Sequence, residues 1–528
     1  MDALQLVLVG ALLFLLPTTL LLRRRRAVQG KRPRLPPGPP SLPLLGSVVW
    51  LTNSPAEIKP LLRRLFQRHG PVVTLRIGSR LSVFVADRRL AHAALVERGA
   101  ALADRPQLAS ARLLGEGHNT ISRAGYGPVW RLLRRNLVSE TLHPSRVRQF
   151  APARRWVRRV LADKLREASS GADALPLQVV ETFQYAMFCL LVLMCFGERL
   201  DEPAVRAIAA AQRDALVYRS RNMPIFAFLP AVTKHLFRAR LDKVRAQRQR
   251  LTELFVPLID ARRELKKNQG GEPRKEQETT FEHSYVDTLL DMKLPDGDGS
   301  ERTITDDEMV LLCAEFLDAG TDTTSTALQW IMAELVKNPA IQEKLHTEIT
   351  AITTDDKEEV SEEDVHKMPY LKAVILEGLR KHPPAHFVLP HKAAEDMELG
   401  GYLIPKGTMV NFMVAEMSRD EREWENPTEF LPERFLPGGD GEGVDVTGTK
   451  GIRMMPFGVG RRICAGLSVA MLHLEYFVAN MVRDFEWLEV PGHEVDFAEK
   501  NEFTVVMKTS LRPRLVPRRT TQISTRTR

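Results

Sequence analysis

The sequence FGVGRRICAG, residues 457–466, places one of the chain's four cysteines among three glycines and two arginines. Glycine has no side chain, so this stretch can turn tightly and bring its backbone close to a flat ligand. Cys464 directly precedes AGLSVAMLHLEYFVANMV, in which apolar residues recur at helical spacing. A cysteine at the start of a helix and near arginines is expected to have a lowered thiol pKa, which makes it ready to bind a ligand.

Two kinds of chemistry remain open for Cys464 at this point. Structural zinc sites and iron–sulfur clusters need several ligands, and one cysteine does not supply them. One possibility is a nucleophile, which needs a histidine base that lies nearby in space. The other is the single axial thiolate ligand of a haem iron.

The composition indicates one large, mainly α-helical domain with small β-sheets. A chain of 528 residues is long for one domain, but we find no internal repeat and no second core. Hydrophobic residues make up 44% of the chain, which is ample for a core. The four cysteines lack the spacing of a disulfide framework, so we expect a reducing compartment.

The net charge of +9 belongs to the two ends of the chain. Residues 23–34 (RRRRAVQGKRPR) carry seven basic side chains, and further arginines lie at 518, 519, 526 and 528. The body between these segments is close to neutral, which argues against a nucleic-acid-binding protein.

The N-terminus predicts a transmembrane signal anchor over residues 1–22. Residues 4–22 form an apolar run of about the ~20 residues that cross a bilayer. A cleaved signal peptide is the alternative, but it has basic residues before its apolar run. Here Asp2 precedes the run and Arg23–Arg26 follow it, which places the body in the cytosol. Residues 23–45, with LPPGPP at 35–40, are predicted to be a basic and proline-rich hinge that acts as a stiff spacer.

Two β-hairpins are predicted in the body, over 72–86 and 401–414, with turns at Gly78-Ser79 and Pro405-Lys406-Gly407. Residues 144–264 are predicted to be helical, and 268–283 and 439–450 to be surface loops. The final residues, 516–528, are predicted to be a disordered basic tail.

A long helix is predicted from Thr305, where Thr305 and Glu308 form a capping box, to Lys337, before Asn338-Pro339. In its middle, AGTDTTST (319–326) combines a glycine with hydroxyl residues that are unfavourable in a helix. Hydroxyls that bond back to the preceding turn are expected to open the helix locally and leave a groove. The alternative is a polar stripe that faces solvent.

Three residues suggest a buried ionic network. Glu377 and Arg380 share one helical face in YLKAVILEGLRKHPP, although this spacing also occurs often by chance. Arg434 in FLPERF is the candidate third member.

Taken together these motifs resemble those of the cytochrome P450 family. FGVGRRICAG matches the family's Phe-x-x-Gly-x-Arg-x-Cys-x-Gly haem-binding motif without a gap. The proline-rich hinge, AGTDTT, EGLR, FLPERF and the cysteine loop follow in the family's order, and WRLLRR and LADRP resemble a plant microsomal A-type member. Leu102 departs from the aromatic residue that is common at its position.

The resemblance implies a cytochrome P450 haem domain over residues 46–515, anchored as a single-pass protein in the endoplasmic reticulum membrane. It implies haem b and a monooxygenase that inserts one oxygen atom of O2 into a lipophilic small molecule. We find no nucleotide-binding or flavin domain, so the electrons are expected from NADPH through NADPH–cytochrome P450 reductase. A reductase-independent isomerase and an inactive haem-binding sensor are the other candidate classes.

Specific residues take roles from this resemblance. Cys464 is the implied axial ligand, in a loop with Phe457, Gly458 and Gly466. The implied partners of the haem propionates are Arg462, Trp130, Arg134 and His391, although Trp130 could also be ordinary core packing. Glu377, Arg380 and Arg434 are implied to form a structural network behind the haem pocket.

Asp322 and Thr323 match the family's acid–alcohol pair, which relays protons to bound dioxygen. Their presence favours monooxygenation over isomerisation, and Gly320 is expected to leave room for dioxygen. The implied substrate pocket is apolar, with His386 as either a polar contact or a solvated loop histidine. Its residues are Phe316, Ala319, His386, Phe387, Val388, Leu389 and Phe503. Fatty acids, terpenoids, phenolics and tetrapyrrole breakdown products remain open as substrates.

Overall fold

The computed structural model describes residues 34–42, 46–47, 58–78, 80–115, 119–169, 178–268, 281, 283–296, 299–353 and 358–518. The predicted anchor, the basic part of the hinge before Arg34, most of the predicted loop at 268–283 and the last ten residues lie outside these ranges.

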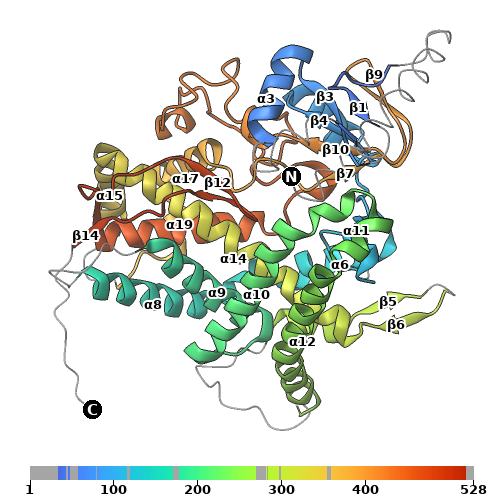
Figure 1. Cartoon of the computed structure of the whole chain (residues 1–528). Helices are drawn as coiled ribbons and strands as arrows, with labels where there is room; N and C mark the ends of the chain where they lie inside the picture. The colour runs from blue at the N-terminus through green and yellow to red at the C-terminus, as the bar shows by residue number, and fades with distance from the viewer. Residues whose placement is uncertain are drawn as a thin grey trace, which may run out of the picture.

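Helices form most of the described structure, as predicted, and a mixed sheet lies at one end (Figure 1). The helices are α3 (Ile58–His69), α4 (Arg88–His92), α5 (Ala109–Leu113), α6 (Pro128–Asn136), α7 (Pro144–Gln149), α8 (Ala151–Ser169), α9 (Val179–Phe196), α10 (Glu202–Asn222), α11 (Pro230–Leu236), α12 (Arg238–Lys267), α13 (Tyr285–Leu290), α14 (Asp306–Lys337), α15 (Pro339–Ile352), α16 (Glu362–Val365), α17 (Pro369–Lys381), α18 (Val414–Met417) and α19 (Leu467–Asp484).

The main sheet has the strand order β1-β2-β3-β4-β10-β7. Its strands are β1 (Ser41–Leu42), β2 (Gly46–Ser47), β3 (Val72–Ile77), β4 (Arg80–Val85), β10 (Met409–Phe412) and β7 (His391–Lys392). Four two-stranded sheets pair β5 (Lys293–Pro295) with β6 (Glu301–Thr303), β8 (Met397–Leu399) with β9 (Tyr402–Ile404), β11 (Phe485–Leu488) with β14 (Arg514–Pro517), and β12 (Glu499–Asn501) with β13 (Val505–Met507).

The first predicted hairpin is confirmed and the second is wrong. β3 and β4 pair antiparallel around Gly78, which has a φ of +60°. β9 instead pairs with β8, while β10 runs parallel to β4 and antiparallel to β7. The turn at Pro405 is present, since Thr408 N donates to Pro405 O at 3.1 Å, but it separates two sheets.

The proline-rich segment packs against the sheet, in contrast to the predicted spacer. Thr74 N of β3 donates to Pro37 O at 2.8 Å. A Cβ atom at Gly38 would lie 1.9 Å from Thr74 O, so only glycine permits this approach. At the other end, β14 extends the ordered fold beyond residue 515, through Pro517.

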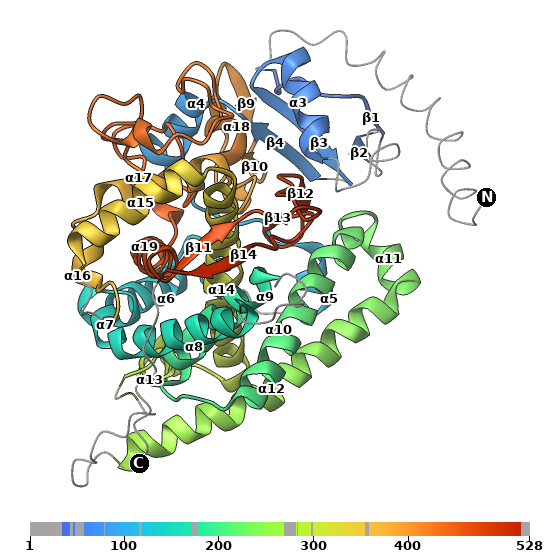
Figure 2. The ribbon, with the colours of Figure 1, turned by 90° about the vertical axis from the view of Figure 1, so that its left-hand side faces the viewer.

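The core of the helical region is built around α14 and α9, which Figure 2 shows near its centre. Among the described residues, α9 is the helix long and apolar enough to cross a membrane, but 78% of it is buried inside the protein. It is a core helix, and it bears no relation to the predicted N-terminal anchor.

α14 begins with the predicted capping box: Glu308 N donates to Thr305 Oγ1 at 3.3 Å, and Thr305 N donates to Glu308 Oε2 at 3.1 Å. Ser325 Oγ donates back to Thr321 O at 2.8 Å, yet the helix stays continuous, so the expected local opening is wrong. The solvent-facing alternative is also wrong, because Thr321, Thr324, Ser325 and Thr326 are buried.

Candidate functional site

The cysteine loop is held in shape by its backbone. Cys464 N donates to Phe457 O at 2.9 Å, just before α19 begins. Gly458 and Gly460 have φ angles of +65° and +71°, which favour glycine. A Cβ atom at Gly460 would lie 2.0 Å from Leu95 O, so the loop packs directly on the backbone of 93–97.

Cys464 differs from the other three cysteines, which are buried, because it is exposed. Protein nevertheless surrounds most of its thiol. This burial raises the pKa of the Cys464 thiol, while the Gly466 N–H and Arg134 lower it. The expected net lowering of the thiol pKa is therefore wrong. A Cβ atom at Gly466 would lie 4.0 Å from Cys464 Sγ, an ordinary van der Waals contact, so this glycine lies beside the sulfur.

The arginines next to Cys464 in sequence do not point at its sulfur. Arg462 donates to three backbone oxygens: Ala103 O at 2.7 Å, Ile121 O at 3.2 Å and Ala124 O at 2.6 Å. Arg461 donates to the Tyr126 hydroxyl. Arg134 of α6 approaches the loop instead and donates to Ile463 O at 2.6 Å.

Trp130 lies beside Arg462, one turn before Arg134 on α6. Its indole Nε1 donates to Ile121 O at 3.1 Å, and the Arg462 guanidinium carbon lies 4.2 Å from its ring centroid. Trp130 is 6% exposed, so it is also part of the packing. The packing alternative is therefore confirmed, while the role of Trp130 toward a haem propionate stays a prediction.

Arg105 and His391 complete a cluster of Arg105, Arg134, His391 and Arg462, which we call the cationic cluster after its three arginines, since His391 itself is neutral in it. His391 Nδ1 donates to Leu102 O at 2.6 Å, and burial, Arg105 and Arg462 lower the pKa of the ring to about 3. Arg105 donates to Ser122 O at 3.1 Å and to Leu389 O at 2.7 Å. Burial and the neighbouring Arg462 lower the Arg105 pKa to about 9.

This cluster fits a ligand that carries carboxylates. Burial is the largest cause of the lowered pKa of Arg462, to about 10, and Arg134 contributes by repulsion. Buried cations that repel one another are stabilised by a nearby anion. The two carboxylates of a haem, next to an accessible cysteine sulfur, match this donor set. Arg105 was missed from the sequence, although LADRP was noted as a family-like detail.

The predicted acid and alcohol of α14 face different partners. Thr323 Oγ1 donates to Ala319 O at 2.7 Å, and Ala319 is exposed. Asp322 is 7% exposed and accepts from Arg213 Nη1 of α10 at 3.0 and 3.2 Å. Burial raises the pKa of Asp322, while Arg213 lowers it. Arg213 had no signal in the sequence, because it lies 109 residues away.

Gly320 lies where α14 packs against α9, and the room that it was expected to leave for dioxygen stays a prediction. A Cβ atom there would lie 2.6 Å from Leu191 Cδ1 of α9. The missing side chain therefore permits the close approach of α9 and α14.

The predicted pocket residues divide into exposed and packed groups. Leu389 is 53% exposed and Phe503 is 40% exposed, and Ala319 is exposed as well. Phe316 is 8% exposed and stacks on Tyr285, with ring centroids 5.0 Å apart.

The side chains of residues 386–388 pack against other parts of the protein. His386 is buried, and its Nε2 lies 3.0 Å from both Glu499 Oε2 and Lys59 Nζ. The interpretation of His386 as a solvated loop histidine is wrong, because the residue is buried and its Nε2 belongs to an internal ion-pair cluster; its polar contact with a substrate stays a prediction. Phe387 packs edge-on to Phe84 at 6.0 Å, and Val388 packs against the cluster of Val72, Val83 and Val459.

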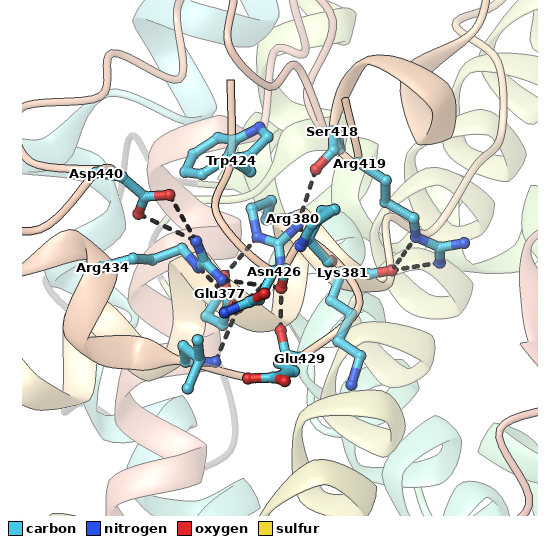
Figure 3. Close-up of polar contacts among 12 residues, drawn as sticks. Glu377, Arg380, Lys381, Ser418, Arg419, Trp424, Asn426, Glu429, Arg434 and Asp440 are labelled. Carbon is cyan, nitrogen blue, oxygen red and sulfur yellow. Dashed lines mark hydrogen bonds and ion pairs between the residues drawn. The ribbon is translucent and has the colours of Figure 1, made fainter. Parts of the chain in front are cut away.

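The structure brings Glu377, Arg380 and Arg434 together (Figure 3). Glu377 accepts from Arg380 Nε at 2.6 Å and Nη2 at 2.8 Å, and from Arg434 Nε at 3.1 Å. Arg434 Nη1 also donates to Asp440 at 3.0 and 2.8 Å, a fourth member that the sequence did not reveal. Arg380 donates further to the carbonyls of Ser418 and Pro427, so the network fixes the loop that precedes the cysteine loop.

Comparison with known proteins gives consistent matches over almost the whole chain. The family model for cytochrome P450 matches residues 36–514. Cytochrome P450 89A9 of Arabidopsis thaliana is 43% identical over 500 residues, which cover 92% of this chain and 94% of the relative. Tryptamine 5-hydroxylase of Oryza sativa subsp. japonica is 33% identical, over 88% of this chain and 86% of the relative.

Two further matches are a plant monooxygenase and a solved structure. Flavonoid 3'-monooxygenase of Arabidopsis thaliana is 31% identical, over 91% of this chain and 90% of the relative. A solved zebra fish cytochrome P450 structure with progesterone covers 88% of this chain and 100% of its own, with a TM-score of 0.70 and 26% identity. Because the family model matches from the proline-rich segment to the last strand, and plant relatives cover about nine tenths of the chain, this chain belongs to the cytochrome P450 family, the haem-thiolate oxidoreductases that incorporate oxygen into their substrates.

Proposed function

We propose that this chain is a membrane-bound monooxygenase that binds haem b through Cys464 and inserts one oxygen atom of O2 into a lipophilic small molecule. Electrons come from NADPH through NADPH–cytochrome P450 reductase. The observation that carries the proposal is the pairing of an exposed cysteine with the cationic cluster behind it. When bound, a haem iron with a thiolate ligand supplies the activation of dioxygen.

The cationic cluster holds the haem carboxylates in this proposal. Arg462 and Arg134 each use some hydrogens on backbone carbonyls, and the guanidinium group carries five in all. His391 donates from Nδ1 to Leu102 O, so its Nε2 donates to a carboxylate only when the ring is protonated, the form that a nearby carboxylate favours. Phe457, Gly458 and Gly466 form the cysteine loop around the metal ligand.

Thr323 and Asp322 move protons to the site where oxygen binds. The Thr323 hydroxyl lies beside the exposed Ala319, while Asp322 contacts Arg213, whose side chain is 40% exposed. This arrangement gives Asp322 a contact that reaches toward solvent, from which protons enter.

The exposed apolar side chains of Leu389, Phe503 and Ala319 support a lipophilic substrate. The names of relatives point the same way, because a flavonoid and tryptamine are both aromatic small molecules. Phe316, packed on Tyr285, shapes the core behind this pocket.

An apolar surface supports the membrane location. Leu229, Val232 and Leu236, at and within α11, are 37%, 51% and 66% exposed. A Cβ atom at Gly78 would lie 2.3 Å from Ala227 O, so this segment touches the β3–β4 turn of the sheet that receives the N-terminal segment. Figure 2 shows α11 and β1 on the same side of the molecule. Exposed leucines at one surface favour contact with lipid.

A basic surface supports docking of an acidic reductase near Cys464. Arg131, Arg135 and Arg461 are exposed, and Arg131 and Arg461 both contact Tyr126. Charge complementarity of this kind steers association and weakens as salt increases.

The test is the carbon-monoxide difference spectrum of the reduced protein, compared with Cys464→Ala. A thiolate-type Soret band in the wild type that is absent from the variant supports the proposal. Haem-loaded, folded wild type without this band would contradict it. NADPH consumption with added reductase, stimulated by a lipophilic compound, tests the electron source and the substrate class.

A further inference from the structure

Glu315 of α14 binds the backbone of the loop at residues 119–124, the loop that also contacts the cationic cluster. Its Oε2 accepts from Ile121 N at 2.7 Å, and its Oε1 accepts from Ser122 N at 2.8 Å. The Ser122 hydroxyl also donates to Oε1. One carboxylate thus holds three donors from two consecutive residues.

The carbonyls of the same loop hold the cationic cluster. Ile121 O accepts from both Trp130 Nε1 and Arg462 Nη1. Ser122 O accepts from Arg105 Nε at 3.1 Å, and Ala124 O accepts from Arg462 Nη2 at 2.6 Å. The peptide group between Ile121 and Ser122 therefore donates its N–H to Glu315, and its carbonyl oxygen accepts from Trp130 and Arg462.

A second acid of α14 holds the start of this loop. Glu308 Oε1 accepts from Asn119 Nδ2 at 2.7 Å, two helical turns before Glu315. Because α14 is a continuous, capped helix, it provides a rigid support for both contacts.

We infer that Glu315 is a positioning residue for the haem site: it fixes residues 121–124, whose carbonyls orient Arg105, Trp130 and Arg462 toward the haem carboxylates. The inference rests on the proposed function. Hydrogen bonds from backbone N–H groups to a carboxylate are stronger than those to a neutral acceptor, so an amide does not replace Glu315. An amide also brings an N–H₂ group against these donors.

The test compares Glu315→Gln with the wild type in the ferric, haem-loaded full-length protein. Transfer of haem to excess apomyoglobin measures the rate of haem loss, and we expect it to rise about tenfold, since charged hydrogen bonds are lost. Circular dichroism in the Soret region is expected to change as well, because it reports the asymmetry of the haem surroundings. Trypsin is expected to cut faster after Arg123.

Asp307→Asn is the matched control, since this exposed acid of α14 contacts only Arg248 among the described residues. It is expected to leave all three readouts unchanged. Ser122→Ala removes one donor to Glu315 and is expected to raise haem loss two- to threefold. Its effect should not add to that of Glu315→Gln, because the two residues share one contact.

Haem loss within twofold of the wild type in folded Glu315→Gln would overturn the inference, while a normal wild-type thiolate spectrum would leave the proposed function intact. If Glu315→Gln does not fold, a wild-type rate of haem loss in Ser122→Ala overturns it instead. Failure of the proposed function appears separately, as absence of the thiolate band in the wild type.

Discussion

Arg213 of α10 bridges Asp322 of α14 to Glu502, at the turn between β12 and β13. Its Nη1 lies 3.0 Å from Asp322 Oδ1, and its Nη2 lies 3.0 Å from Glu502 Oε2. Thr326 and Thr504 also join α14 to this turn, with their hydroxyl oxygens 2.8 Å apart. The Arg213 side chain therefore links the proposed proton-relay acid to α10 and to the β12–β13 turn.

Arg213→Gln is expected to loosen the β12–β13 turn and the adjacent part of α10. The Arg213 side chain is 40% exposed, so solvent screening limits its ion pairs to about 1 kcal/mol. Amide hydrogen exchange in these segments should accelerate about fivefold. Arg206→Gln, on the same helix, removes an exposed pair with Glu202 and a cation–π contact with Tyr185, neither of which involves the β12–β13 turn, and should leave these amides unchanged. Equal exchange rates in both variants would refute the bridging role.

Gly460→Ala is expected to destabilise the cysteine loop strongly. The new Cβ atom would lie 2.0 Å from Leu95 O, and the φ angle of +71° adds backbone strain. Gly438→Ala is the control: Gly438 has a φ of +86° but nothing within 4 Å of its Cβ position, so it carries strain of only about 1–2 kcal/mol. Urea unfolding and haem content measure the difference. Equal losses in the two variants would mean that the close contact with Leu95 is not important.

Glu377→Gln is expected to cost about 3–5 kcal/mol of unfolding free energy, because it leaves Arg380 and part of Arg434 buried without their counter-charge. All three side chains are almost fully buried, with exposures of 0%, 0% and 4%. Glu264→Gln provides a contrast, since it breaks an exposed pair with Lys267 that is worth about 0.5 kcal/mol or less. Urea denaturation of both variants checks the prediction. A loss below about 1 kcal/mol for Glu377→Gln would show that the network does not support the fold.

The sequence predicted those features whose signal is local. The capping box at Thr305 and the turn at Gly78 depend on neighbouring residues, and both are present. The cysteine loop is also local, since Phe457 O and Cys464 N close it within eight residues. Features of this kind can be predicted because the interacting groups lie in one short stretch.

The remaining features depend on partners that sequence patterns do not identify. β10 has the composition of a hairpin strand, but its partner β4 lies more than 300 residues earlier. Arg462 binds backbone carbonyls, and every residue type has a carbonyl, so no residue pattern marks these acceptors. The same holds for Glu315, whose main partners are two backbone N–H groups.

Glu475 in α19 gives the domain a stability that depends on pH. Burial raises its pKa to about 7, and Lys372 lowers it only in part. The unfolded carboxyl ionises near pH 4.3, so the unfolded state releases its proton first as pH rises. Stability is therefore lost between about pH 4.3 and pH 7, and it stays lower at higher pH.

Glu475→Gln removes this titration and is expected to stabilise the protein at pH 8, by about 4 kcal/mol at most. The gain should shrink to about 1 kcal/mol at pH 5, where the native carboxyl is protonated and only the unfolded carboxyl is ionised. Urea unfolding of the haem-loaded protein at both pH values measures it, with Glu264→Gln as a control on an exposed acid. A gain of equal size at pH 5 and pH 8 would mean that the variant acts through packing. The ionisation of Glu475 would then have no part in the pH dependence of folding.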